Sequence, residues 1–178
     1  MIIVNGSVSA GCRYTARMPV LRVATTADAA LIAQQRHRMF VDAGQPDDAK
    51  MAAMEAAFLP WVQQRLENET YLGWLASEGD RVVGGAGMWL MDFPPHFLHV
   101  EAVRAYLLNF YVDPEFRGQG LARMLLHTTM DEARRRGIDV VTLHASKFGR
   151  HLYEQNGFKQ TNELMLRGAG VAPDQTVK

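Results

Sequence analysis

The residues from Val112 to Ala122 have the types and spacing of an anion-binding turn. An apolar strand ends at Val112, glycines follow at Gly118 and Gly120, and an amphipathic helix comes directly after them. The first N–H groups of a helix have no partner within the helix and lie at the positive end of its dipole, so such a turn suits a phosphate or pyrophosphate. Arg117 adds a full positive charge beside it.

The spacing within this turn excludes two common phosphate-binding motifs. A nucleotide P-loop needs Lys and then Ser or Thr after its second glycine, whereas Leu121 and Ala122 follow Gly120 here. A dinucleotide fingerprint needs a third small residue where Arg123 stands, and an acidic residue about twenty positions further on at the end of a second strand. Neither motif fits the chain.

The pattern Arg-x-x-Gly-x-Ala, formed by Arg117, Gly120 and Ala122 after Val-Asp-Pro, resembles the acetyl-CoA pyrophosphate loop of the GNAT superfamily of N-acetyltransferases. A second block, Leu-Tyr-Glu-Gln-Asn-Gly-Phe from Leu152 to Phe158, resembles the other common signature of that family. The family's frequent Asn, seven residues before the tyrosine, is Ser146 in this chain. The resemblance covers about residues 20–167 and is specific over the two blocks.

The resemblance implies a mixed α/β fold with a central, mostly antiparallel sheet, whose splayed middle strands admit the cofactor arm, flanked by helices. It implies an enzyme that moves an acetyl group from acetyl-CoA, as co-substrate, directly to a primary amine of an unknown acceptor. The alternative is a non-catalytic module that binds or senses acyl-CoA. The residues expected to bind acetyl-CoA are Phe110, Tyr111, Val112, Arg117, Gly118, Gln119, Gly120, Leu121, Ala122, Arg123 and Ser146.

Two residues are predicted to take part in the chemistry. The resemblance makes Tyr153 the general acid that protonates the departing CoA thiolate. An amine also has to lose a proton before it attacks, and Glu101, in a segment rich in carboxylates and imidazoles, is the predicted base or anchor for a water relay. His37, Asn109 and His144 are weaker candidates for that base. Backbone N–H groups near Tyr111 are expected to stabilise the negative charge that develops on the acetyl oxygen.

Hydrophobic periodicity and turn residues predict one domain over residues 20–168, with tails at 1–19 and 169–178. In the first helix, Ala30, Ile32, Ala33, Met39 and Phe40 are expected to face the core, with residues 36–38 partly outward. Pro60 is expected to bend or split the second helix. The predicted order is strand 20–24, helices to about 41 and over 51–66, a hairpin of strands 70–76 and 81–91, strand 105–113, helix 118–136, strand 140–145, helix 148–156 and strand 158–166.

Composition narrows the possible partners. Nineteen basic and nineteen acidic residues give a net charge of zero, which argues against nucleic acid as a partner. No apolar stretch approaches the length of a membrane span. Cys12 is the only cysteine, which fits a cytoplasmic protein, and the histidines match no short metal-ligand spacing, so no metal is expected.

A homodimer is a further prediction that the resemblance implies, and two apolar segments could each supply an exposed patch for it. These segments are the second helix around Phe58, Trp61 and Val62, and the loop from Phe93 to Leu98.

Overall fold

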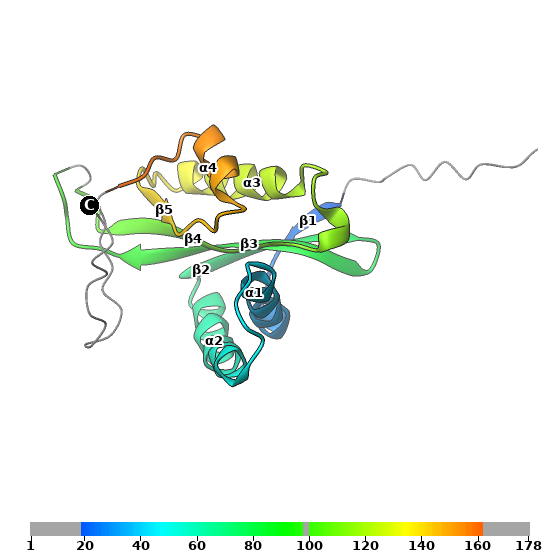
Figure 1. Cartoon of the computed structure of the whole chain (residues 1–178). Helices are drawn as coiled ribbons and strands as arrows, with labels where there is room; N and C mark the ends of the chain where they lie inside the picture. The colour runs from blue at the N-terminus through cyan, green and yellow to red at the C-terminus, as the bar shows by residue number, and fades with distance from the viewer. Residues whose placement is uncertain (1–18, 98–99, 162–178) are drawn as a thin grey trace, which may run out of the picture. The chain divides into compact units, whose positions relative to one another are not determined.

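The computed structural model describes residues 19–97 and 100–161. The chain divides into two compact units, one ending at His144 and one starting at Ala145, and each is described by itself. The first unit is a five-stranded sheet with helices on both faces (Figure 1). In chain order it contains β1 (Val20–Val23), α1 (Ala29–Asp42), α2 (Ala49–Glu67), β2 (Tyr71–Glu78), β3 (Arg81–Asp92), β4 (Val103–Val112), α3 (Leu121–Arg135) and β5 (Val141–Leu143).

The strands lie in the sheet in chain order, from β1 to β5. Neighbours are antiparallel except for β4 and β5, which are parallel, so the mixed, mostly antiparallel architecture expected from the sequence is confirmed. The pairing with β5 runs only from Ala105 to Leu107 on β4, and β4 continues beyond it to Val112. β5 therefore ends opposite the middle of β4.

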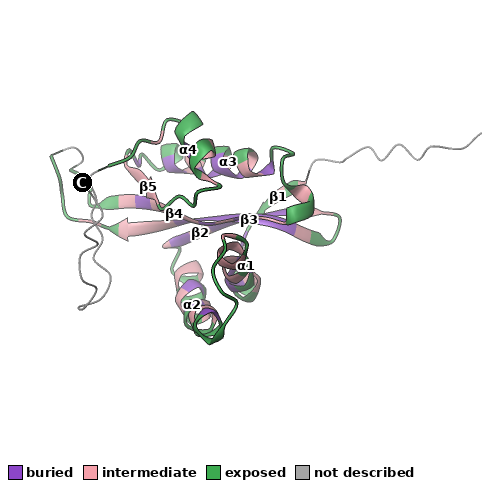
Figure 2. Ribbon diagram, viewed as in Figure 1, coloured by how far each residue is buried: buried purple, intermediate pink, exposed green. Residues whose placement is uncertain are grey.

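Helices α1 and α2 cover one face of the sheet, and α3 covers the other. The buried residues of both layers face the sheet (Figure 2). On the first face, Ile32, Phe58 and Val62 pack with Tyr71 and Leu75 of β2 in one hydrophobic cluster. On the opposite face, the buried residues of α3 are Leu121, Leu125, Leu126, Thr129 and Ala133. This two-sided core fixes β3 and β4 between the helices.

The buried face of α1 differs from the expected one. Ala30 is exposed, whereas Gln35 is buried and Arg36 is partly buried. Arg36 follows Ile32 by four residues, so helical spacing places both on one face.

Three further expectations on local structure need correction. Pro60 lies inside α2, which runs unbroken from Ala49 to Glu67. The third helix begins at Leu121 rather than Gly118, because Gly118 and Gly120 adopt left-handed backbone conformations. Residues 158–161 form no strand, and the rest of the strand predicted up to Leu166 lies outside the described residues.

The second unit contains α4 (Arg150–Gln155). In the described part of the chain, no helix has both the length and the apolar character needed to cross a membrane.

Candidate acyl-transfer site

The turn before α3 contains two glycines in left-handed backbone conformations. Gly118 and Gly120 have φ angles of 76° and 85°, values that glycine adopts without strain. Gly120 is the N-cap of α3, and no side chain caps that helix end. A Cβ built on either glycine would meet no atom within 4 Å, so packing inside the protein does not require these glycines. The arrangement leaves room for a ligand directly in front of the helix N-terminus.

The side chains of Arg117 and Gln119 hydrogen-bond to backbone carbonyls next to this turn. The Nε of Arg117 donates to the carbonyl of Val112 at 2.9 Å, and its guanidinium forms an ion pair with Asp42 at the end of α1. The Nε2 of Gln119 donates to the carbonyl of Glu115 at 3.0 Å. Both side chains were expected to bind the cofactor. In this structure they brace the turn.

The other predicted cofactor residues on α3 differ in exposure. Leu121 is buried in the core beneath the helix, so only its backbone can face a ligand. Ala122 is partly buried and Arg123 is exposed one turn into the helix. The N–H groups of the first helical turn have no carbonyl partner within the helix.

Strand β4 leads into this turn through a β-bulge. Gly87 of β3 pairs with Leu108 and Gly85 pairs with Tyr111, so Asn109 and Phe110 share the space opposite one residue. Asn109 has a φ of 56°, which is unusual for a residue other than glycine. A bulge interrupts the ladder and turns the local backbone groups in new directions. The predicted Phe110, Tyr111 and Val112 lie at this bulge or directly after it.

A tyrosine and a histidine meet at the edge where β4 and β5 pair. The hydroxyl of Tyr106 on β4 hydrogen-bonds to Nδ1 of His144, which follows β5 directly. Their rings lie 5.6 Å apart between centroids. Sequence reasoning named His144 only as a weak candidate and missed Tyr106. The missing signal was the register between β4 and β5, which pairs Tyr106 with Thr142.

Glu101 lies at the other end of β4 from the bulge. It is exposed and comes before β4, whereas the bulge lies towards the other end of that strand. At about 3.3 Å per residue, the stretch from Val103 to Asn109 spans roughly 20 Å. The structure therefore does not bring Glu101 together with the bulge.

The second unit holds the remaining two predicted residues. The Oγ of Ser146 accepts a hydrogen bond from the N–H of Gly149 at 3.2 Å, in the turn that precedes α4. Tyr153 is buried, and its ring contacts Phe158 edge-on at 5.7 Å. Burial raises the pKa of Tyr153 to about 12, so this phenol is neutral at physiological pH.

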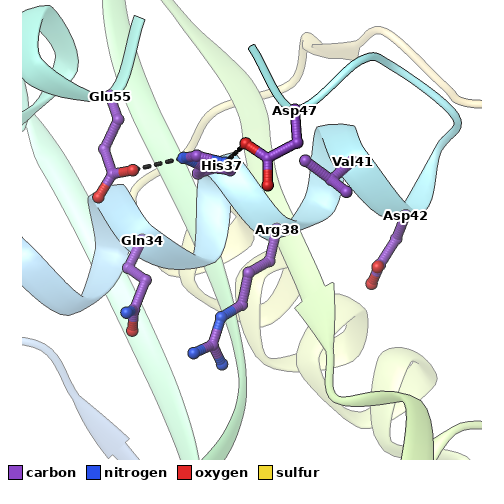
Figure 3. A pocket seen from close by; sticks show the side chains of 7 residues that line it. All are labelled: Gln34, His37, Arg38, Val41, Asp42, Asp47 and Glu55. Atoms are coloured by element: carbon purple, nitrogen blue, oxygen red, sulfur yellow. Dashed lines mark hydrogen bonds and ion pairs between the residues drawn. The ribbon is translucent and has the colours of Figure 1, made fainter. Parts of the chain in front are cut away.

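The cavity beside α1, of about 280 Å³, contains the other histidine considered as a base (Figure 3). The Nδ1 of His37 lies 2.5 Å from Glu55, and its Nε2 lies 3.0 Å from Asp47. Hydrogen bonds to Glu55 and then Asp47 raise the pKa of His37. Both ring nitrogens are thus engaged by carboxylates, which favours the protonated form and disfavours a role as base.

Comparisons with known proteins agree with this geometry. Residues 33–158 match the model of the acetyltransferase (GNAT) family. The uncharacterized N-acetyltransferase YhfO of Bacillus subtilis is 34% identical over 146 residues, which cover 79% of this chain and 89% of that protein. A match to human N-acetyltransferase 8B spans only 39% of the human protein.

Solved structures share the fold. A GCN5-related N-acetyltransferase from Ralstonia eutropha superposes with a TM-score of 0.81 and 35% identity, covering 85% of this chain and 99% of that one. A predicted acetyltransferase from Clostridium acetobutylicum, crystallised with acetyl-CoA, gives a TM-score of 0.78 and 29% identity, covering 85% and 96%. The chain therefore belongs to the acetyltransferase (GNAT) family and is an acyltransferase enzyme.

Proposed function

We propose that this protein transfers an acetyl group from acetyl-CoA to a primary amine while both substrates are bound. The observation that carries the proposal is the turn at Gly118 and Gly120, which opens an uncapped helix directly after a bulged strand. Helix N-termini of this kind favour phosphate groups. The crystal structure with acetyl-CoA from the Clostridium acetobutylicum relative supports acetyl-CoA as the ligand.

Backbone groups are the main contacts in this proposal. The N–H groups from Gly118 to Arg123 hold the pyrophosphate, and Arg117 contributes positive charge and braces the turn. The pantetheine arm lies along β4 beyond Leu107, where the pairing with β5 has ended. Ser146 is the predicted polar contact from the second unit.

Acetyl-CoA supplies an activated thioester carbonyl. The backbone N–H groups of the segment from Phe110 to Val112 stabilise the negative charge on its oxygen as the amine attacks. A bond forms between the amine nitrogen and the acetyl carbon, the carbon–sulfur bond breaks, and its electron pair leaves with the sulfur. The amine gives up one proton, and the thiolate gains one.

The hydrogen-bonded pair of Tyr106 and His144 is the proposed acceptor for the amine proton, in place of Glu101. An imidazole is the side chain best suited to accept a proton near neutral pH. Tyr153 remains the proposed donor to the thiolate. A raised pKa makes a phenol a weaker acid, so we assign it a hydrogen bond to the sulfur, with water completing the proton transfer.

The alternative is a protein that only binds acyl-CoA and senses it. A paired tyrosine and histidine beside the cofactor-binding strand favours catalysis over sensing. No candidate group of three or more metal-ligating side chains occurs in residues 19–97 and 100–161, and a metal-free site stays a prediction.

The test is a panel of amines, including spermidine, free amino acids and a lysine-containing peptide, assayed for release of CoA thiol. We expect turnover of at least one amine, and a fall in kcat of about a hundredfold in Tyr106→Phe and in His144→Gln. Glu101→Gln is the control and should keep wild-type turnover. Acetyl-CoA binding without turnover of any amine would support the sensing module instead.

Cytoplasmic location and a homodimer stay predictions. The patch that motivated the dimer needs correction, because Phe58 and Val62 are buried in the core. Within the described part of the other segment, Phe97 remains, with 86% of its surface exposed.

A further inference from the structure

A buried polar group lies directly under the bulge of β4. Asn109 is only 3% exposed. Its Nδ2 donates to the hydroxyl of Tyr71 on β2 at 3.0 Å, and its Oδ1 accepts from Arg36 on α1 at 2.8 Å. Side chains from two other elements thus hold the residue that has the left-handed backbone conformation.

Arg36 is in an unfavourable place for a charge. Its guanidinium stacks over the rings of Phe40 and Phe58, at 4.9 Å and 4.7 Å from their centroids, and burial lowers its pKa. Contacts of this kind with aromatic rings stabilise a guanidinium. Arg36 also reaches beyond these rings, because its Nη1 donates to Asn109 at the bulge.

Tyr71 lies against Gly87 of β3, and its hydroxyl reaches Asn109 on β4. A Cβ at Gly87 would lie 2.0 Å from the Tyr71 hydroxyl, which no packing tolerates. Tyr71 itself is almost fully buried. The absence of a side chain at Gly87 thus leaves the space that the Tyr71 hydroxyl occupies when it accepts from Asn109.

We propose that Arg36 and Tyr71 are positioning residues for acetyl transfer. They hold the Asn109 side chain from both ends, and so fix the direction of the backbone N–H groups at the bulge. This inference rests on the proposed function, in which those groups contact the acetyl oxygen. Donors aimed in advance at a developing charge lose effect when they shift by a fraction of an ångström. The hydrogen bond from the charged Arg36 is the stronger of the two contacts.

Two substitutions at Asn109 separate the effect of its backbone conformation from the effect of its side-chain hydrogen bonds. Asn109→Gly keeps access to the left-handed conformation and removes both hydrogen bonds. Asn109→Asp tolerates the same conformation and can still accept from Arg36. We expect Asn109→Gly to lower kcat at least tenfold while the Kd for acetyl-CoA stays within threefold. Asn109→Asp should recover most of that loss, and Tyr71→Phe should lose less than Asn109→Gly.

The direct readout is the infrared carbonyl stretch of bound acetyl-CoA carrying ¹³C in the acetyl carbonyl. Hydrogen bonds to the oxygen lower this frequency, so we expect a downshift in the wild-type complex and a smaller one in Asn109→Gly. Met51→Ala is the stability control, because Met51 is buried in α2 and is not part of the hydrophobic cluster that contains Tyr71. It should lower Tm with no change in carbonyl frequency.

Each failure has its own signature. If wild-type protein binds acetyl-CoA without any downshift, the oxyanion assignment of the proposed function is wrong. If the wild-type downshift appears and persists unchanged in Asn109→Gly, the positioning role of Arg36 and Tyr71 is wrong. A loss of kcat in Met51→Ala equal to that in Asn109→Gly would also overturn the inference.

Discussion

Helices α2 and α3 begin in opposite ways. At α2 the carboxylate of Asp48 accepts from the N–H groups of Lys50 and Met51, at 2.9 Å and 3.2 Å. At α3 the equivalent position is Gly120, which has no side chain to offer. Both helix ends have the same positive dipole and N–H donors without partners inside the helix. The protein supplies its own anion to α2, and no side chain supplies one to α3.

The largest loss of acetyl-CoA affinity should come from a side chain placed at the N-terminus of α3. Gly120→Val puts a branched side chain where the phosphate would sit, and several charged hydrogen bonds worth about 1.5–3 kcal/mol each are lost. We expect the Kd for acetyl-CoA, measured by titration calorimetry, to rise at least about a hundredfold. Gly137→Val is the matched control, because Gly137 also has a positive φ and open space at its Cβ, but lies beyond the other end of α3. Equal weakening in both variants would contradict the comparison.

A smaller loss should follow from Arg117→Ala. This change removes the charge beside the turn and the brace to the carbonyl of Val112, and we expect about tenfold weaker binding of acetyl-CoA. Asp42→Asn removes the ion-pair partner and keeps the Arg117 charge, so its effect should stay below threefold. If both variants lose affinity equally, Arg117 acts only through its contact with Asp42.

A change at the N-terminus of α2 should lower stability and leave the affinity for acetyl-CoA unchanged. Asp48→Ala removes the cap and should lower the free energy of unfolding by about 1 kcal/mol, as measured by urea denaturation. The affinity for acetyl-CoA should stay at the wild-type value. Asp48→Asn keeps an acceptor and should retain most of the stability. A change in acetyl-CoA affinity in Asp48→Ala would mean that the two helix ends are not independent.

The smallest effect concerns how stability changes with pH. It involves His37 and Asp47, the residue before the cap Asp48. Hydrogen bonds to Glu55 and then Asp47 raise the pKa of His37, so this histidine stabilises the fold most when it is charged. Its contribution should be complete below about pH 6.5 and fade as the pH rises through the higher folded-state pKa. We expect Tm, followed from pH 5 to 9, to fall less over this window in His37→Gln. Parallel curves for both proteins would show that the contact contributes nothing.

The same contrast explains how much the sequence could predict. The turn at Gly118 and Gly120 is a local pattern, in which the glycine spacing and the following amphipathic helix predict a turn before a helix N-terminus, as the structure has it. The hairpin of β2 and β3 is equally local, and Gly79, with a φ of 57°, forms its turn. Such features depend on neighbours in the chain, so one sequence suffices to predict them.

Contacts between distant residues were beyond sequence reasoning. Tyr106 meets His144 across 38 positions, and Arg36 meets Asn109 across 73. These contacts depend on strand register and on the β4 bulge, and no short sequence pattern predicts either feature. Glu101 was chosen because its segment is rich in carboxylates, without a measure of how far β4 carries the bulge from it. The inward position of Arg36, however, could have been inferred from Ile32 four residues earlier.

The glycines of β3 have a consequence for mutational scanning of this enzyme. A Cβ at Gly85 would lie 2.4 Å from the side-chain oxygen of Gln35, and one at Gly87 would strike Tyr71. In a library selected for growth, Gly87 should tolerate almost no substitution, whereas Gly85 should tolerate small side chains because the Gln35 amide can move aside. The depletion at Gly87 would resemble that of residues in the active site. Measuring cellular protein abundance beside growth would separate the two, because a variant that cannot pack disappears from the cell, whereas a variant that only lacks chemistry accumulates normally.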